Sequence, residues 1–496
     1  MSRSASFVSL AGIKINRDKP EPIHRQLYSE IRGMILSGHL PAGARLPPTR
    51  ILCDELAISR STVVEAVAQL TAEGYVVGQT GRGTFVSETL PEQVMRPPVV
   101  MGAPPTETNT ASIRLSERGL LLTAGTVHPD AYPRPFLPGL PDTVQFPTKH
   151  WGRILGKHWK NPPKTLGYDS GAGYLPLREA IADHARLSRR VNCTPEQVII
   201  TSGAQQALFM CAQMFATRGD QVWVENPGYG GAFAAFATTE LDLVPIPVDQ
   251  HGIDVEAGIR LAPKARLAYV TPSHQYPAGG TLDISRRLRL LEWAKDANSL
   301  ILEDDYDSEY RYTGHPLESL QGLDKNGQVI YIGTFSKTIF PSLRLGYVIV
   351  PKGLERAFAK ARYNLDRGSE RIMQMALNDF MREGHFTRHI RRMRLLYAKR
   401  QQVMVDAIRE YCGDWLEVAP APAGLHLVGW LAAGVDDVAV AAEFAKHEIF
   451  TPPLSSYSIA PLERGGLVMG YAGVPEDEIV SAVKQMGQNF QAQKLV

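Results

Sequence analysis

"QVIYIGTFSKTIFPSLRLGYVIV", residues 328–350, sets two apolar runs rich in β-branched residues on either side of a polar turn. Continuous apolar runs of this length are typical of strands that are buried on both faces of a parallel sheet. The turn carries a single lysine, Lys337, between small hydroxyl residues, and Arg344 stands just before the second run. The stretch therefore predicts two buried strands joined by a turn that presents one amine.

Similar apolar runs alternate with helical patterns from about residue 126 onward. The runs lie at residues 197–201, 221–225, 241–248, 266–271 and 299–305. This alternation predicts an α/β domain over 126–350, in which helices cover both faces of a mostly parallel sheet. Such sheets bind ligands at the carboxyl ends of their strands. Residues 351–496 are mostly helical with a few short strands, and we expect a helical connection and a smaller C-terminal domain there.

The composition of the 496-residue chain is that of a globular protein with two or three domains. The net charge is only +2, so any affinity for nucleic acid must come from a local patch. The cysteines are widely separated and lack metal-ligand spacing, which favours a reducing cytoplasm and no metal site. We find neither a signal peptide nor the ~18 apolar residues of a membrane helix. We therefore expect a cytoplasmic protein that does not contact membranes.

Residues 1–87 have the pattern of three helices followed by a β-hairpin. The helical patterns lie at 22–38, 49–57 and 59–74, and "YVVGQTGRGTFV" contains two β-rich runs around a glycine-rich turn. This is the outline of a winged helix-turn-helix, an α+β fold that binds DNA. Residues 88–125, rich in Pro, Thr and small residues, predict a linker.

In a winged helix-turn-helix, the third helix enters the major groove with its N-terminal residues near phosphates and base edges. A basic residue at the tip of the hairpin reaches toward the minor groove or a phosphate, and arginines beside the second helix contact the backbone. The candidate DNA contacts are Arg45, Arg50, Ser59, Arg60, Ser61, Thr62, Arg82 and Gly83. The alternative is a small helical domain with an ordinary scatter of surface arginines.

The motifs "LPPTR", "LAISRSTVVEAVAQLTAEGYV" and "GRGTFV", which lie between residues 46 and 86, decide between these alternatives. Together they resemble the GntR family of bacterial regulators almost position for position. The resemblance implies that double-stranded DNA is a partner.

Lys337 is a candidate Schiff-base lysine, because burial lowers the pKa of an amine and frees it for nucleophilic attack. A Ser-Lys dipeptide alone is a weak signal, so the neighbouring motifs matter. Pyridoxal phosphate needs an amine for its aldehyde, a carboxylate for its ring nitrogen and a donor to its phenolic oxygen. It also needs donors to its phosphate and a flat group against its ring. The chain offers a candidate for each requirement.

Asp304 and Tyr306 follow an apolar run, where they would contact the ring nitrogen and the phenolic oxygen, respectively. In "TSGAQQAL", residues 201–208, small residues precede a helix, so backbone N–H groups there can bind a phosphate. Tyr229 would stack on the ring. The candidate phosphate contacts are Gly203, Ala204, Gln205, Thr334, Ser336 and Arg344. The alternative is a set of acidic strand ends, a helix cap and a core tyrosine that never meet.

Together these residues resemble the fold-type I aminotransferase superfamily over roughly residues 113–490. In that superfamily the matching lysine forms an aldimine with pyridoxal phosphate. "GYDSGAGYLPLREAIA", residues 167–182, resembles the stretch whose tyrosine, here Tyr168, reaches the cofactor phosphate of the other subunit. The resemblance implies pyridoxal phosphate as cofactor and a homodimer with its sites at the interface.

A GntR-like winged helix joined to an aminotransferase-like domain resembles the MocR family of bacterial transcription regulators. "EDDYDSEYRY" matches that family closely, and "SHQYPAGG" is near its usual "SHQYPTG", with Ala278 where threonine is common. The resemblance covers the whole chain. It implies a DNA-binding regulator that senses pyridoxal phosphate itself, an amine or an amino acid through aldimine chemistry. It also implies a head-to-tail, domain-swapped homodimer.

The positions that would hold a substrate carboxylate lack arginine. An aminotransferase normally holds this group with a bidentate arginine. The corresponding position in "GGLVMGYAG" is Val468, and Gly231 stands where a GABA-responsive relative has an arginine; only Arg464 lies nearby. Without this contact a substrate is poorly positioned, so we expect a sensor without net turnover. The alternative is an active aminotransferase with an accessory N-terminal domain.

The run "RHIRRMRLLYAKR", residues 388–400, is strongly basic. It predicts a helix whose charged face is solvated and supports the small domain. The alternative is a second contact with the DNA backbone.

Overall fold

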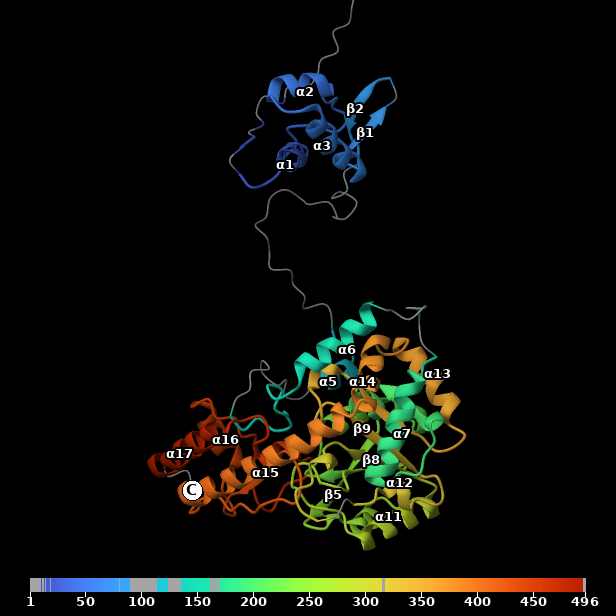
Figure 1. The fold of residues 1–496 in the computed structure, drawn as a ribbon, viewed down its shortest axis with the longest axis vertical. Coiled ribbons are helices and arrows are strands. Elements are labelled where there is room, and N and C mark those ends of the chain that lie inside the picture. The colour runs from blue at the N-terminus through green and yellow to red at the C-terminus, as the bar shows by residue number, and fades with distance from the viewer. Residues whose placement is uncertain are drawn as a thin grey trace, which may run out of the picture. The chain divides into compact units, whose positions relative to one another are not determined.

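The computed structural model describes residues 19–79, 81–89, 114–123, 135–160, 170–314 and 317–493, together with positions 10, 13, 15–17 and 167. The chain forms two compact units, Met1–Arg114 and Leu115–Val496 (Figure 1).

The described part of the first unit contains three helices and a hairpin, as the sequence predicts. They are α1 (Ile23–Leu36), α2 (Thr49–Leu56), α3 (Arg60–Ala72), β1 (Val76–Gln79) and β2 (Gly83–Val86). The two strands pair antiparallel. The apolar faces of α1 and α3 form the core of the unit, in which Leu27, Ile31, Val63 and Leu70 are fully buried. The unit is therefore a winged helix-turn-helix.

The second unit is built on an eight-stranded sheet in the order β3-β10-β9-β8-β7-β4-β5-β6. The strands are β3 (Val198–Thr201), β4 (Gln221–Asn226), β5 (Asp242–Asp249), β6 (Gly252–Ile253), β7 (Leu267–Val270), β8 (Leu300–Asp305), β9 (Val329–Thr334) and β10 (Gly346–Ile349). The β5-β4-β7-β8-β9 pairs are parallel, whereas β10 is antiparallel to both β3 and β9. The two strands predicted around Lys337 are thus neighbours of opposite direction.

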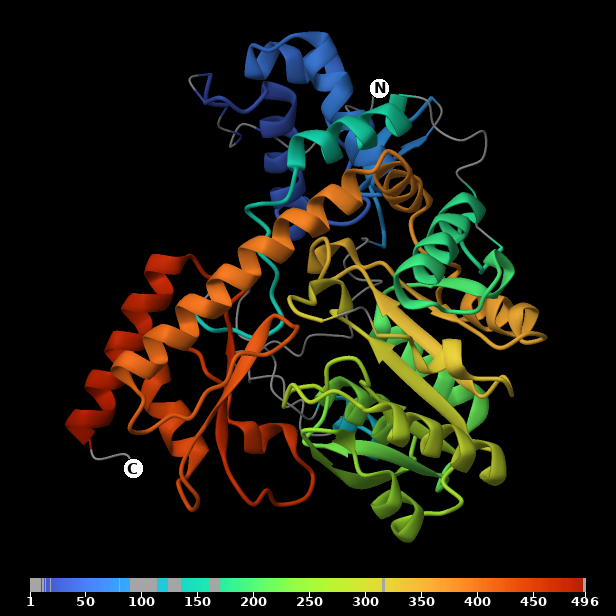
Figure 2. The same cartoon turned by 60° about the horizontal axis from the view of Figure 1, so that its bottom comes forward.

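Helices cover both faces of this sheet (Figure 2). The helices between residues 115 and 382 are α5 (Glu117–Thr123), α6 (Thr148–Lys160), α7 (Leu175–Arg189), α8 (Ala204–Phe215), α9 (Gly230–Thr238), α10 (Val255–Leu261), α11 (Ile284–Ala297), α12 (Leu320–Leu323), α13 (Glu355–Asp366) and α14 (Arg371–Arg382). Of these, α5 packs on α9 and α6 packs on α14. One apolar cluster joins a face of the sheet to α8 and α9, and two others join the opposite face to α7 and to α11. Burial on both faces explains why the strands are continuous apolar runs.

A smaller domain follows the sheet along the chain. It contains β11 (His426–Trp430), α16 (Asp437–Ala445), β12 (Gly466–Gly470) and α17 (Glu476–Gln493). The long helix α15 (His385–Tyr411), orange in Figure 2, connects it to α14 and packs along α17. Among the described residues, short 3₁₀ turns are η2 (Pro195–Gln197), η3 (Ser308–Tyr310), η4 (Pro341–Leu343) and η5 (Leu454–Tyr457). Among the described helices, none is long and apolar enough to cross a membrane.

The basic run on α15, for which the sequence predicts a solvated face that supports the small domain, is exposed at each of its lysines and arginines except Arg400. Arg400 is buried, and its guanidinium lies 2.9 Å from the carboxylate of Asp142. Lys399 lies 3.1 Å from Glu476 on α17. The C-terminal end of the run therefore joins α15 to neighbouring segments by ion pairs, although Lys399 itself remains exposed.

Trp223 on β4 is fully buried in the apolar cluster that joins the sheet to α10 and α11. Its ring stacks on Trp293 at a centroid distance of 3.8 Å, and its indole N–H donates to the carbonyl of Ala262 at 2.9 Å. A Cβ added at Gly258 would lie 2.6 Å from this ring, so the backbone of α10 approaches it closely.

We predict that Trp223→Ala lowers the free energy of unfolding of the second unit by about 3–5 kcal/mol, because it leaves a cavity in a closely packed core. Urea unfolding followed by tryptophan fluorescence measures this unit specifically, since all six tryptophans belong to it. Trp159→Ala, at an exposed position of α6, is the matched control. Equal destabilisation by the two substitutions would contradict this description of the core.

Candidate functional site

The N-terminus of α3 presents a group of hydroxyl side chains. Ser59 is the N-cap, as its position in the sequence suggested, and its Oγ accepts a hydrogen bond from the N–H of Thr62 at 3.2 Å. The same oxygen lies 2.8 Å from Ser61 Oγ and 2.7 Å from Thr62 Oγ1. Arg60 is exposed in the first turn beside them. This helix end combines N–H groups, hydroxyls and a cation, all of which suit a phosphate or a base edge.

The wing holds the remaining basic candidates of this unit. Gly83 has a φ of +113°, and a Cβ there would lie 2.9 Å from Arg45 Nε, so Arg45 lies directly against the wing. Its guanidinium also lies over the ring of Phe85. Arg82 is exposed in the turn before β2, and Arg50 is exposed in the first turn of α2.

In the second unit, Lys337 follows β9 at the edge of the sheet where the parallel strands end. Its Nζ donates to the carbonyl of Gly139 at 2.7 Å. Burial lowers the pKa of this amine, and the carboxylates of Asp307 and Asp304 oppose that shift. A Cβ at Gly139 would lie 2.9 Å from Nζ, so only glycine allows this approach without displacing the lysine. Burial thus shifts the pKa of this amine in the direction that nucleophilic attack requires.

Asp304, near the end of β8, is buried with one carboxylate oxygen unpaired. Tyr269 donates its hydroxyl to Oδ2 at 2.8 Å, whereas Oδ1 has no hydrogen-bond partner among the described residues. Burial raises the pKa of this carboxyl to about 7. A protonated ring nitrogen would supply both the missing hydrogen bond and the opposite charge.

The candidate phosphate contacts meet at the N-terminus of α8. Gly346 on β10 pairs with Thr201 on one side and with Thr334 on the other. The beginning of α8 and the Lys337 turn therefore lie at the same edge of the sheet. Arg344 Nη2 donates to the carbonyl of Ser202 at 2.7 Å, and a Cβ at Gly203 would lie 3.5 Å from that nitrogen.

The small and hydroxyl residues around this helix end complete the site. Gly203, with a φ of +98°, precedes Ala204 and Gln205 in the first turn of α8. Thr334 Oγ1 donates to Ser336 Oγ at 3.1 Å in the segment leading to Lys337. N–H groups, hydroxyls and a guanidinium at one helix N-terminus are suited to a phosphate.

Tyr229 lies at the N-terminus of α9, beside the start of α8. A Cβ at Gly231 would lie 2.4 Å from the Tyr229 ring and 2.5 Å from Gln205 Oε1. The pKa of Tyr229 is raised to about 12, first by burial and then by the charge of Asp304, which Arg344 partly offsets. Tyr229 is therefore close to both the ring-nitrogen candidate and the phosphate candidate.

Tyr306 brings to this site a histidine that the sequence reading did not single out. The Tyr306 hydroxyl lies 2.9 Å from His274 Nδ1, and the same nitrogen lies 3.0 Å from the carboxylate of Asp307. The ring of His426 lies 5.4 Å from that of His274, and burial lowers the pKa of His426 to about 3. The interpretation of the "SHQYPAGG" motif rests on its resemblance to the MocR family, which assigns no role in the site to its histidine. Tyr168 lies outside the described residues.

Neither of the two positions considered for a substrate arginine, 468 and 231, holds a cation. Val468 is fully buried in β12 against Val428 and Leu454. Gly231 has no space for a side chain unless Tyr229 and Gln205 move. Arg464 lies 2.7 Å from the carboxylate of Glu417 and is therefore already paired.

Comparison with known proteins matches both units. Residues 23–86 match the gntR family of bacterial regulatory proteins, and residues 158–489 match aminotransferase class I and II. The "probable rhizopine catabolism regulatory protein MocR" of Rhizobium meliloti is 39% identical over 484 residues, 96% of each chain. The chain belongs to the MocR family of HTH-type transcription regulators.

Two further relatives agree with this assignment. The HTH-type pyridoxine biosynthesis transcriptional regulator PdxR of Corynebacterium glutamicum is 31% identical over 94% of this chain and 96% of its own. The crystal structure of LysN, the α-aminoadipate aminotransferase of Thermus thermophilus, superimposes with a TM-score of 0.71 at 25% identity, over 77% of this chain and 98% of that one. This MocR-family chain thus joins a DNA-binding unit to an aminotransferase fold, which implies a site for pyridoxal phosphate.

The raised pKa of Asp304 predicts a pH dependence of stability. The folded protein holds this proton up to about pH 7, whereas an unfolded chain releases it near pH 4. The unliganded protein should therefore lose stability as the pH rises from about 4 to about 7, because ionisation leaves a buried charge.

We predict that Asp304→Asn makes this loss smaller. Burial also raises the pKa values of Glu225 and Glu303 to about 7, so these two groups should still make the free energy of unfolding fall with pH in the variant. Urea unfolding of cofactor-free protein across this pH range measures the effect. Asp296→Asn, at an exposed position on α11, is the control. If the free energy of unfolding falls with pH equally steeply in Asp304→Asn and in the control, burial does not raise the pKa of Asp304 as described.

Proposed function

We propose that this protein is a homodimeric transcription regulator that binds pyridoxal phosphate at the Lys337 site and senses either that cofactor or an amine or amino acid. The observation that carries the proposal is a buried carboxylate with one unpaired oxygen beside a buried amine of lowered pKa. The aminotransferase fold makes pyridoxal phosphate the natural ligand for such a pair. We also propose the division 1–87, 88–125, 126–350 and 351–496 for the DNA-binding domain, the linker, the large domain and the C-terminal region.

Pyridoxal phosphate supplies an aldehyde that combines reversibly with amines, so a protein that holds it can register an amine. Asp304 would hold a proton on the ring nitrogen through Oδ1, and Tyr269 keeps the other oxygen in place. Arg344 and the first turn of α8 would fix the phosphate, while Tyr229 would limit movement of the ring. Lys337 supplies the amine, and Tyr306 would donate to the phenolic oxygen.

The absence of a substrate arginine among the described residues of these motifs favours sensing over turnover. Val468 is apolar and Arg464 is paired with Glu417. Instead, the rings of His274 and of His426, whose pKa burial lowers to about 3, lie on the side of the site near Tyr306. We infer that the effector is either the cofactor itself or a molecule whose recognition does not depend on tight binding of an α-carboxylate.

The competing proposal is an active aminotransferase, which the complete set of candidate cofactor residues favours. Steady-state turnover with a panel of amino donors and keto acids separates the two. Rapid multiple turnovers would favour the aminotransferase proposal. No more than a single half-reaction per site would favour the sensor proposal.

For DNA binding, we predict that Arg60→Ala weakens binding to the protein's own upstream DNA by about tenfold or more, because a base-edge or phosphate contact at the start of α3 is lost. An electrophoretic shift assay with the full-length protein measures the change. Arg218→Ala, which removes an exposed arginine from the second unit, is the control. If both variants bind as tightly as the wild type, α3 is not the recognition helix.

For the cofactor site, we predict that Lys337→Ala abolishes the visible absorption of protein saturated with pyridoxal phosphate. Cofactor binding should weaken without vanishing, because Asp304 and Arg344 remain. DNA affinity should be preserved, and the response of DNA binding to cofactor or amine should be lost. Absorption spectra and shift assays with and without cofactor test this.

Lys325→Ala, at an exposed loop position, is the matched control for Lys337→Ala. A Lys337→Ala variant that keeps the absorption would identify another lysine as the reactive one. A variant that loses the absorption but regulates normally would show that the amine has no part in sensing.

A further inference from the structure

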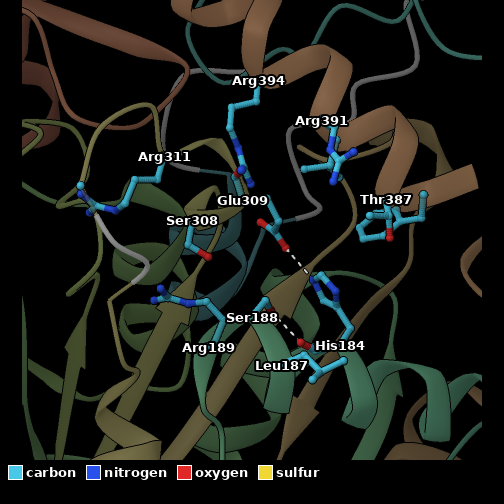
Figure 3. Close-up of a pocket in the computed structure, with 13 residues that line it drawn as sticks. His184, Leu187, Ser188, Arg189, Ser308, Glu309, Arg311, Thr387, Arg391 and Arg394 are labelled. Atoms are coloured by element: carbon cyan, nitrogen blue, oxygen red, sulfur yellow. Dashed lines mark hydrogen bonds and ion pairs between the residues drawn. The ribbon is translucent and has the colours of Figure 1, made fainter. Parts of the chain in front are cut away.

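A cavity of about 430 Å³ opens on the second unit, between the C-terminal end of α7, the turn η3 and the first turns of α15 (Figure 3). It has none of the candidate cofactor residues in its lining. Its volume is within the range of sites for small metabolites. The exposed part of the basic run on α15, for which the sequence suggested only solvation or DNA contact, lies along one wall.

Two arginines of α15 reach into this cavity. Arg391 and Arg394 are three residues apart and therefore share one face of the helix. Figure 3 shows their side chains above Glu309, one on each side. Arg394 is fixed there, because its Nε and Nη2 donate to the backbone carbonyl of Glu309 at 2.9 and 2.7 Å.

A third cation, Arg311, lines the cavity from the segment after η3. It is half-buried, and its pKa is lowered by burial and by the charge of Arg189. Its hydrogen bond within the protein is to the carbonyl of Ser273 at 3.3 Å. An anion nearby would relieve this unfavourable burial of positive charge.

These three guanidinium groups lack a carboxylate partner within the described parts of the chain. The one acidic side chain in the lining, Glu309, lies 3.5 Å from His184 Nε2 instead. Arg189, which also lines the cavity, is neutralised by Asp305 at 2.7 Å. The cavity therefore carries more positive charge than negative.

Uncharged groups complete the lining. Thr387 and Ser308 supply hydroxyls, while Phe386 and Ile390 form a buried apolar surface beside the arginines. Guanidinium groups bind carboxylate or phosphate oxygens in pairs, and an apolar surface accommodates a short carbon chain. We propose that this cavity binds a small organic dianion, a dicarboxylate or a phosphate monoester, through Arg391, Arg394 and Arg311.

The position of the cavity indicates what such binding would do, an inference that rests on the proposed function. The segment 304–311 separates it from the cofactor site, with Asp304 and Tyr306 belonging to the cofactor site and Glu309 and Arg311 to the cavity. Between them, Tyr310 is fully buried and donates its hydroxyl to the backbone carbonyl of Lys337 at 3.3 Å. An anion that displaces Arg311 or Glu309 would therefore shift the residues that hold pyridoxal phosphate.

Isothermal titration of the full-length protein with succinate and with glycerol 3-phosphate tests the proposal. We expect saturable binding of at least one of them. Binding of succinate alone would identify the ligand class as dicarboxylates. Binding of glycerol 3-phosphate alone would identify it as phosphate monoesters. Arg391→Gln should weaken that binding about tenfold or more, because a charge-assisted hydrogen bond is lost. Arg394→Gln should do the same, and Arg391 is the safer test because it bonds to no described residue. Arg409→Gln, at an exposed site near the other end of α15, is the matched control.

Several results would overturn the site. One is the absence of saturable binding by either anion, and another is equal affinity in Arg391→Gln and Arg409→Gln. Binding that is lost in Arg344→Gln but not in Arg391→Gln would assign the anion to the candidate phosphate site at α8. Because these titrations use protein free of pyridoxal phosphate, their outcome does not depend on the proposed function.

The coupling is tested separately by measuring the affinity for pyridoxal phosphate with and without a saturating concentration of the anion that binds. We expect a change of about threefold or more in the wild type and none in Arg391→Gln. An unchanged affinity in a wild-type protein that binds both ligands would overturn the coupling.

Discussion

Three acidic residues end β8, and the way in which each buried carboxylate is satisfied determines the chemistry of this edge of the sheet. Glu303 accepts the backbone N–H groups of Leu320 and Gln321 at the start of α12. Asp305 is neutralised by Arg189, although its Oδ1 also has no hydrogen-bond partner among the described residues. Asp304 has only the Tyr269 hydroxyl, and its Oδ1 remains unpaired among the described residues. An unpaired buried carboxylate oxygen is costly, so a cationic ligand is the physical complement of this arrangement.

The neighbouring elements provide the rest of a binding site around this carboxylate. Strand order places β9, and therefore Lys337, next to β8. The antiparallel β10 begins at the same edge, so Arg344, which lies just before it, is close to the start of α8. The fold thus gathers an amine, a carboxylate and a helix end suited to a phosphate, while the positions considered for a substrate arginine are apolar or already paired. This arrangement is the basis of the proposal that the site holds a cofactor for sensing.

Much of this could be predicted from the sequence, because the signals are local. The apolar runs predicted the strands, Ser59 predicted the start of α3, and Lys337 stood out in its turn. Contacts between distant segments could not be predicted in this way. Tyr269 meets Asp304 across 35 residues because β7 and β8 are neighbours, and Gly139 meets Lys337 across 198 residues. The burial of Arg400 against Asp142 and the arginine-lined cavity likewise depend on tertiary packing.

The most direct test of the central claim is chemical trapping of the cofactor. The full-length protein is saturated with pyridoxal phosphate, reduced with borohydride, digested and mapped by mass spectrometry. The account predicts one pyridoxyl group, located on Lys337. Modification of a different lysine, or of none, would contradict it.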